Sequence, residues 1–335
     1  MKKQLLSILT VSAMAAGSCT VAIAKNEKQN VQPIKVGEAT VVSAGNYYSF
    51  HIDQASFVSF LMPNSDASTG SNISVSSDQK NYDVLGGGDG IRAYVFLPAG
   101  NYYVNTDTEL QSDSLTISAT ALNTLPVLKS GKTYKGTLND RDFLVYRYKN
   151  KRSTHMTLTS QTKKSLKPAL SVSDGDPDTQ NDGAVEVPSK YTNYYIKGGT
   201  NYVIYTQEKA GAYSLKATAK AFKETAKETV KHNNDSYKTA SSLKLSKNYY
   251  GAVHEEMDPD DYYKLTLKKK KKVTISLKAK HGNYIFYTKK GAKSGKAYKG
   301  LEYVNKTKKV TLKPGTYYVD VQAQGSGSTY CLKVK

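Results

Sequence analysis

One short sequence pattern occurs three times in this chain of 335 residues, and it narrows the folds that the chain can adopt. The copies are LPAGNYYV at 97–104, IKGGTNYV at 196–203 and LKPGTYYV at 312–319. In each copy an apolar residue leads into a glycine-containing turn. An alternating stretch rich in Tyr and Val follows, as in a β-strand that leaves a tight turn. The copies lie about one ordinary domain length apart, too far for a solenoid repeat, so the pattern predicts three tandem domains.

Further alternating stretches repeat together with this pattern. A closing stretch follows each copy, at 115–119, 213–217 and 330–334. A strand, turn and strand at 261–277 aligns without a gap with 142–158, and the first copy, at 47–60, is looser. There is no convincing amphipathic helix, and a second sheet is the simplest cover for the buried face of the first. We therefore predict an all-β protein with three tandem jelly-roll-like β-sandwich domains after a signal peptide.

The predicted domain boundaries follow the repeats. Residues 1–24 are the signal peptide, 25–122 the first and most divergent domain, 123–222 the second, and 234–335 the third. The linker at 223–233 is charged and poor in apolar residues. This composition predicts that the second and third domains move independently.

The first residues have the features of a targeting signal. Lys2 and Lys3 precede an apolar run from Leu5 to Ala16, and Ala22-Ile23-Ala24 has the small-x-small form of a cleavage site. These features predict a secretory signal peptide, and hence a secreted, extracellular or cell-surface protein. The run is too short for a membrane-spanning helix, and no later stretch approaches eighteen apolar residues. As an alternative, the residues up to Cys19 resemble a bacterial lipobox, in which Cys19 would carry a lipid anchor.

Cysteine usage agrees with export and cleavage. The chain contains two Cys, and removal of the leader leaves only Cys331, so no internal disulfide can form. Cys331 lies on a predicted strand, where we expect it to be a small buried hydrophobic residue. Secretion without disulfides, together with a Lys-rich composition, is typical of a Gram-positive bacterium.

The formal net charge of +20 indicates an anionic partner. The most basic segment is an unbroken run in the third repeat, formed by Lys268, Lys269, Lys270, Lys271 and Lys272. Because it lies between two predicted strands, it is either a solvated hairpin turn or a site that attracts polyanions. Outside a Gram-positive cell these would be teichoic acids, acidic polysaccharides or glycosaminoglycans. No nucleic-acid-binding motif occurs, and the aromatic residues are not interleaved with Arg.

The aromatic composition is unusual, with 27 Tyr and no Trp. On alternating strands many of these Tyr must lie in cores or form cross-strand pairs. Others are expected on exposed faces, where a Tyr ring and its hydroxyl suit sugar rings or extended peptides.

The third repeat resembles the bacterial pre-peptidase C-terminal (PPC) domain, a family related to the collagen-binding modules of clostridial collagenases. The resemblance rests on Asn234-Asp235, Tyr250-Gly251, DPDDYYKL at 258–265, the Lys-rich turn and LKPGTYYV at 312–319. It extends more weakly over 123–222 and 31–122. The family implies a jelly-roll-like β-sandwich, usually attached to a secreted peptidase, and some members bind calcium, collagen or polysaccharide.

A candidate calcium site follows from the same segment, because calcium is bound by six to eight oxygen ligands. The candidate ligands are Asn234, Asp235, Asp258, Asp260 and Asp261. Calcium-binding relatives carry additional Glu residues before the Asn-Asp pair, where this chain has Val230 and His232. A second acidic segment, Asp174-Gly175-Asp176-Pro177-Asp178 with Asp182, lacks the Gly and the final Glu of an EF-hand loop, and an exposed turn is the alternative. No cofactor is required, and calcium is the one candidate ion.

No catalytic motif is present in the sequence. The five His are scattered, and there is no nucleophile elbow, phosphate-binding loop or positioned partner for Cys331. The sequence therefore predicts a non-catalytic binding protein of the bacterial surface or extracellular matrix, with tandem modules that bind polysaccharide, cell-wall polyanion or a collagen-like matrix protein. The alternative is a structural or regulatory partner of a secreted protease or of a cell-envelope protein.

Overall fold

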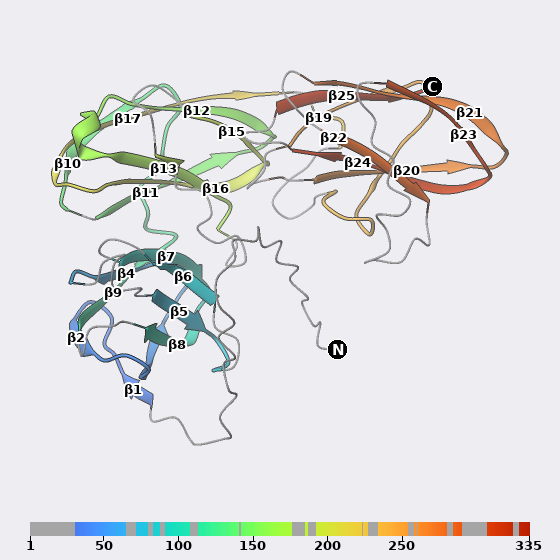
Figure 1. The fold of residues 1–335 in the computed structure, drawn as a ribbon. Helices are drawn as coiled ribbons and strands as arrows, with labels where there is room; N and C mark the ends of the chain where they lie inside the picture. Colours follow the sequence, from blue (N-terminus) through green and yellow to red (C-terminus); the bar gives the residue numbers. More distant parts are fainter. Residues whose placement is uncertain are drawn as a thin grey trace.

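The structure is a computed structural model in which β-strands provide nearly all of the regular structure (Figure 1). It describes residues 31–64, 72–79, 83–87, 91–107, 113–140, 142–175, 185–186, 192–222, 224–226, 234–253, 258, 260–279, 284–289, 307–323 and 328–335. Within these ranges the only helix is one short 3-10 turn at Lys164–Leu166, and no helix is long and apolar enough to cross a membrane. The predicted signal peptide and lipobox lie outside the described residues.

Six sheets pair into three β-sandwiches, which confirms the predicted fold class. Domain 1 contains the strands β1 (Val31–Pro33), β2 (Ala39–Val42), β3 (Tyr47–Ile52), β4 (Ser56–Met62), β5 (Asn72–Ser76), β6 (Asp83–Gly87), β7 (Ile91–Leu97), β8 (Gly100–Asp107) and β9 (Asp113–Ala121). Domain 2 contains β10 (Thr133–Leu138), β11 (Phe143–Asn150), β12 (Thr154–Ser160), β13 (Pro168–Ser173), β14 (Val185–Glu186), β15 (Thr192–Ile196), β16 (Gly199–Gln207) and β17 (Gly211–Ala221). Domain 3 contains β18 (Ser241–Ser242), β19 (Asn248–Val253), β20 (Asp260–Leu267), β21 (Lys271–Ala279), β22 (Tyr284–Lys289), β23 (Thr307–Leu312), β24 (Gly315–Gln322) and β25 (Ser328–Val334).

The strand order is that of a jelly roll in each domain. In domain 2 the two sheets have the orders β10-β17-β12-β15 and β11-β16-β13-β14. The first strand lies beside the last and the second beside the second-last, so the chain wraps around itself as a double-sheet jelly roll. Domain 1 has the equivalent sheets β2-β9-β4-β7 and β3-β8-β5-β6, with β1 added parallel to β3. In domain 3 the described strands form β19-β25-β21-β23 and β20-β24-β22, with β18 added parallel to β20.

The sequence repeat therefore corresponds to equivalent strands. The three copies of the pattern lead into β8, β16 and β24, which are the second-last strands of their domains. The closing stretches are β9, β17 and β25, the last strands. In two of the copies a Tyr that follows the turn bonds back to it, since Tyr102 Oη donates to the carbonyl of Pro98 at 2.9 Å and Tyr317 Oη donates to that of Lys313 at 3.0 Å.

Each sandwich has its own apolar core between its two sheets. Strand alternation places the core residues, as in β21, where Val273, Ile275 and Leu277 are buried and the residues between them are partly or fully exposed. Tyr contributes strongly to these cores, and the largest fully buried side chains include Tyr48, Tyr194, Tyr205 and Tyr263.

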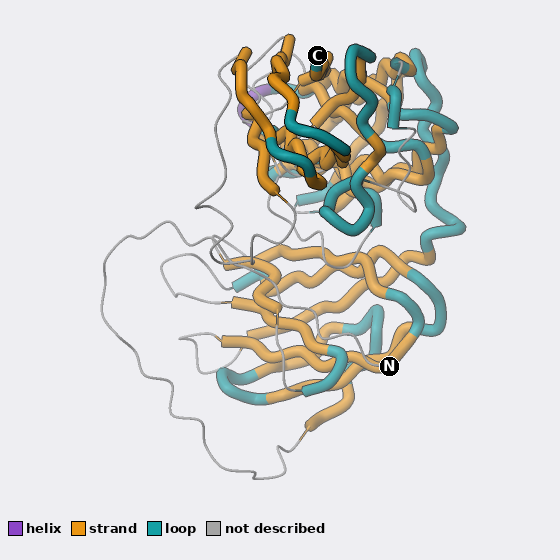
Figure 2. Tube along the Cα trace, turned by 90° about the vertical axis from the view of Figure 1, so that its right-hand side faces the viewer, coloured by secondary structure: helices purple, strands orange, loops and turns teal. Residues whose placement is uncertain are grey.

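A fourth apolar cluster joins domain 1 to domain 2, and the sequence did not predict it. The outer face of β4 and β7 presents Phe57, Tyr94 and Phe96 to the outer face of β11 and β16. Phe96 and Tyr202 pack with ring centroids 4.8 Å apart. In addition, Tyr94 Oη lies 2.8 Å from Ser171 Oγ. Domains 1 and 2 are therefore a stack of sheets with a continuous buried layer between them (Figures 1 and 2).

We expect Phe96→Ala to weaken the contact between domains 1 and 2. Removal of a buried Phe ring costs about 3–5 kcal/mol when the cavity does not collapse, and Phe96 is 3% exposed. Limited proteolysis should then cut more rapidly in the connection at 121–126, while Val41→Ala, at a residue that is 73% exposed, should have no effect. Equal protease resistance in both variants would contradict a stabilising domain contact.

Candidate functional site

The predicted lysine run is divided between a turn and a strand. Lys268, Lys269 and Lys270 are exposed in the turn between β20 and β21. Lys271 and Lys272 are the first residues of β21, where they pair in register with residues of β23.

The solvent-facing side of the sheet β19-β25-β21-β23 extends this basic region. Lys272 and Lys278 alternate with the buried residues of β21 and therefore point to solvent. Lys309 of β23 lies opposite Thr274, and Lys333 of β25 lies opposite Ser276 on the same face. We call the group Lys272, Lys278, Lys309 and Lys333 the lysine face of domain 3.

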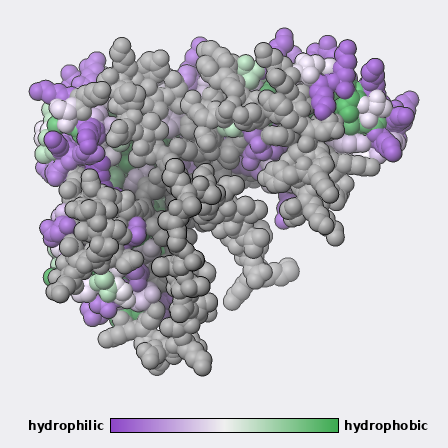
Figure 3. Space-filling model, in the orientation of Figure 1, coloured by the Kyte–Doolittle hydropathy of each residue, from purple (hydrophilic) through white to green (hydrophobic). Residues whose placement is uncertain are grey.

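No strand of this sheet contains an acidic residue. The sequences of β19, β21, β23 and β25 carry Lys, Ser, Thr and Tyr among their polar residues, and neither Asp nor Glu. Hydrophilic residues gather at the end of the molecule where β21 and β23 lie (upper right in Figure 3). Like charges on one face without compensating carboxylates produce a field that attracts anions.

Cys331 lies on this face rather than in the core. The expectation of a buried thiol is wrong, because the buried positions of β25 belong to Tyr330, Leu332 and Val334 and the alternation places Cys331 outside. It is a free cysteine of intermediate exposure, in register between Tyr250 and Lys278.

The five predicted calcium ligands lie at the start of domain 3, close to the end of domain 2. Asn234, Asp258 and Asp261 are buried, and Asp235 and Asp260 are partly buried. The structure divides them among different partners.

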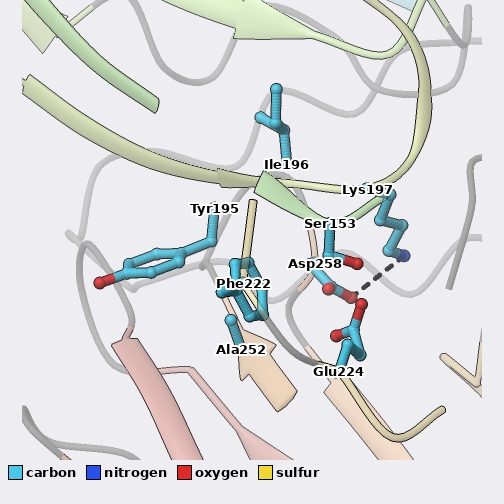
Figure 4. Close-up of a pocket in the computed structure, with 8 residues that line it drawn as sticks. All are labelled: Ser153, Tyr195, Ile196, Lys197, Phe222, Glu224, Ala252 and Asp258. Atoms are coloured by element: carbon cyan, nitrogen blue, oxygen red, sulfur yellow. Dashed lines mark ion pairs between the residues drawn. The ribbon is translucent and has the colours of Figure 1, made fainter. Parts of the chain in front are cut away.

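Asp235 and Asp258 share a lysine from domain 2. Lys197 Nζ lies 2.6 Å from Asp235 Oδ2 and 3.0 Å from Asp258 Oδ1. The Lys197 side chain is only 7% exposed, and it extends from the turn between β15 and β16, which contains the second copy of the repeat. Figure 4 shows the pair of Lys197 and Asp258 beside Glu224, Phe222, Ala252 and Tyr195, with residues of both domains around it. A single buried ammonium group thus pairs with two of the predicted ligands.

Asn234 and Asp261 form a separate hydrogen-bonded group. Asn234 Nδ2 donates to Asp261 Oδ1 at 2.9 Å, and the hydroxyl of Tyr330 donates to Asp261 Oδ2. Tyr263 Oη lies 2.7 Å from Tyr330 Oη. The group packs directly on the backbone of Gly251, where a Cβ atom would collide with the Tyr330 hydroxyl, so this position requires glycine.

A further carboxylate, Asp320 of β24, lies near Asp260, and the sequence did not indicate it. Burial, followed by repulsion from Asp260, raises the pKa of Asp320 to about 8, although hydrogen bonds with Gln322 and Tyr262 oppose the shift. Burial, followed by repulsion from Asp235, raises the pKa of Asp260 to about 6, and a hydrogen bond with Gln322 opposes it. Both carboxyl groups are therefore more easily protonated than in solution.

Calcium binding at these residues stays a prediction. Within the described part of the chain, no group of three or more Asp, Glu, His or Cys side chains is arranged to hold a metal ion. The ligand set is also engaged by Lys197 and Tyr330, which the sequence did not indicate. Of the second acidic segment, Asp174 and Gly175 are described, and Gly175 is in a left-handed turn with φ of 82°. Asp176, Asp178 and Asp182 lie outside the described residues.

The local sequence gives little indication of which residues hold domains 2 and 3 together. A lysine in a glycine-containing turn predicts a solvated side chain, and only the packing of the next domain shows that Lys197 is buried. The linker also contributes, because Thr225 N donates to the carbonyl of Tyr250 at 2.8 Å and Tyr250 N donates to Thr225 Oγ1 at 2.9 Å. These contacts join the two domains, in contrast to the independent movement predicted from the linker composition.

Comparison with known proteins gives structural likenesses only. No protein-family model matches the chain, and no curated protein is similar to it in sequence. A crystal structure of the pre-peptidase C-terminal domain of a collagenase from Bacillus anthracis matches with 22% identity over 29% of this chain and 94% of that domain, with a TM-score of 0.25. A triple jelly-roll protein of an archaeal virus matches with 9% identity over 87% of this chain and 82% of its own, with a TM-score of 0.21. The CUB1-EGF-CUB2 domains of rat MASP-1 match with 9% identity over 62% of this chain and 99% of their own, with a TM-score of 0.19.

These TM-scores are all below 0.5, so the fold class rests on the strand order of the three domains.

We expect Asp320→Asn to change the pH dependence of domain 3. The pKa of Asp320 is about 8 in the folded state and about 3.9 in an unfolded chain. Folding therefore favours the protonated acid, and this contribution is fully present below pH 4 and is lost as the pH rises through 8. Asn cannot ionise, so the variant should melt higher than the natural protein at pH 8, by roughly 4–8 °C for each kcal/mol gained.

Thermal melting between pH 5 and 9 measures this effect. Asp53→Asn is the control, because the Asp53 side chain is 95% exposed. Parallel pH profiles for the natural protein and Asp320→Asn would contradict a buried, protonated Asp320.

We expect Lys197→Met to destabilise the junction of domains 2 and 3 by about 3 kcal/mol. This is the lower end of the cost of removing one partner of a buried ion pair, because the Asp235 side chain is 27% exposed. Melting in millimolar calcium and in chelator then tests the role of the ammonium group. If the Lys197 ammonium group supplies the positive charge that a calcium ion would otherwise supply to Asp235 and Asp258, calcium should stabilise the variant more than the natural protein. A large calcium response in the natural protein that Asp260→Ala abolishes would instead support the calcium prediction.

Proposed function

We propose that this protein is a secreted, non-catalytic binding protein of the bacterial surface or extracellular matrix that binds anionic polymers through its PPC-like β-sandwich modules. The observation that carries the proposal is the lysine face of domain 3, a sheet surface with four outward lysines. None of its strands contains an acidic residue. The polymers with this chemistry include cell-wall polyanions and acidic polysaccharides, and an acidic collagen-like matrix protein is a further class.

The fold supports a binding module. A β-sandwich presents broad, rigid sheet faces, and polar residues on such faces are free to contact a partner once the inner faces have formed the core. The resemblance of the third repeat to the PPC domain also favours an accessory role, since domains of that family are usually attached to a secreted peptidase.

The buried carboxylates of domain 3 have structural partners. Asp258 pairs with Lys197, and Asp261 accepts hydrogen bonds from Asn234 and Tyr330. Asp258 thus belongs to the domain junction and Asp261 to a hydrogen-bonded group inside domain 3, and these structural contacts favour a non-catalytic role.

We expect the triple variant Lys272→Glu, Lys309→Glu and Lys333→Glu to lose retention on immobilised heparin and on purified Gram-positive cell wall. The natural protein should elute from both at higher salt than the variant, because each lost lysine removes one ionic contact. The matched control changes three exposed lysines of domain 2, Lys149, Lys151 and Lys163, to Glu.

Equal losses in the two triple variants would show that only net charge matters and would contradict a defined binding face. Retention of the natural protein on neither matrix, together with capture of a single secreted protein, would favour the alternative role as a partner of a protease or envelope protein.

A further inference from the structure

The sheet of domain 2 that is equivalent to the lysine face also presents lysines to solvent. In the sheet β10-β17-β12-β15, Leu215 and Ala217 of β17 point into the core, so Lys216 and Lys220 point outward. Lys135 of β10 lies opposite Ser214 on the same outer face. All three lysines are exposed.

This second sheet also lacks acidic residues. None of the strands β10, β12, β15 and β17 contains Asp or Glu, and their other outward residues are mainly Thr and Ser. In contrast, the opposite sheet of domain 3 contains Asp260, Asp261 and Asp320. In domain 3 the absence of acidic residues is thus a property of one sheet. In domain 2 the opposite sheet contains one acidic residue, Glu186 of the short strand β14.

The two sheets meet at the domain junction. The hydroxyl of Tyr195, at the end of β15, forms a hydrogen bond with the backbone of Thr329 in β25. Phe222, just after β17, and Ala252 of β19 line the same small pocket as Lys197 and Asp258. In Figure 1, β12 and β17 of domain 2 and β25 of domain 3 lie along the same upper side of the two domains.

The corresponding sheet of domain 1 is not available for binding. Its outer face carries Phe57, Tyr94 and Phe96, which are buried against domain 2. The exposed basic surface therefore comprises two domains.

We propose that domains 2 and 3 form one continuous binding surface for a linear polyanion, made of Lys135, Lys216 and Lys220 together with the lysine face of domain 3. The inference rests on the proposed function and extends it, because it assigns half of the site to domain 2 and specifies a long polymer. Charge complementarity selects a chain with repeated sulfate or phosphate groups, and the outward Ser and Thr hydroxyls are additional hydrogen-bond donors to such groups.

The size of the surface sets the length of the ligand. The strands β17 and β25 contain 11 and 7 residues, and laid end to end at 3.3 Å per residue they would extend over about 60 Å. A polymer of that length contacts both halves at once, which raises its affinity without any new contact. A short oligomer contacts only one half at a time. The Lys197 ion pair keeps the two halves aligned.

The test compares short and long heparin fragments and polyphosphate chains in a binding assay on the full chain. Changing Lys135, Lys216 and Lys220 to Glu should weaken binding of the long chains at least tenfold and of the short ones much less. The Lys149, Lys151 and Lys163 control should reduce both only slightly. Tight binding of heparin with weak binding of polyphosphate of the same length identifies sulfate as the ligand group, and the reverse identifies phosphate.

Lys197→Met provides an independent measurement, because it changes the junction without removing a lysine from the surface. If circular dichroism shows that the variant is folded, its affinity for long chains should fall towards that for short ones. If it does not fold, the length dependence of the natural protein and of the domain 2 variant decides the question.

Two results would overturn the inference. One is equal affinity of the natural protein for short and long chains, and the other is a domain 2 variant that binds like the control. If the domain 3 variant still loses binding in that case, the proposed function stands without the two-domain site. If the domain 3 variant also binds like the control, both proposals fail.

Discussion

The structure depends on the burial of one face of every sheet. Alternating apolar and aromatic residues, such as Val273, Ile275 and Leu277 of β21, fill the space between the two sheets of each sandwich. This packing buries the inner faces, and it does not determine what covers the outer faces. The outer faces are therefore where the three domains differ, although their strand orders are equivalent.

The equivalent sheets have different surroundings in the three domains. In domain 1 the outer face of β4 and β7 is aromatic and is buried against domain 2. In domains 2 and 3 the corresponding faces carry lysines and hydroxyl groups and are solvent-exposed. One repeated fold thus supplies a docking face in one copy and a basic surface in the other two, because the outward residues of the equivalent strands differ in chemistry.

Among the described residues, the junction of domains 2 and 3 contains a buried ion pair beside a few apolar side chains. A buried ion pair gains little net stability, since the desolvation of the charges offsets their attraction, but loss of one partner is costly. Lys197 with Asp235 and Asp258 accordingly favours one arrangement of the two domains over others. The nearby carboxyl groups of Asp260 and Asp320, whose pKa values are raised by burial, make the same end of domain 3 sensitive to pH.

The sequence by itself determined the fold class, the three domains and the strands of the repeat, because turn residues and period-two alternation are local properties of the chain. It also located the lysine run and the acidic residues at the start of domain 3. Only the tertiary structure decided which outer faces are covered, since Phe96 on β7 contacts Tyr202, which is distant in the sequence. It likewise decided that Lys197 is buried between Asp235 and Asp258. Such contacts depend on the position of one domain on the next, and no local pattern in the chain encodes that position.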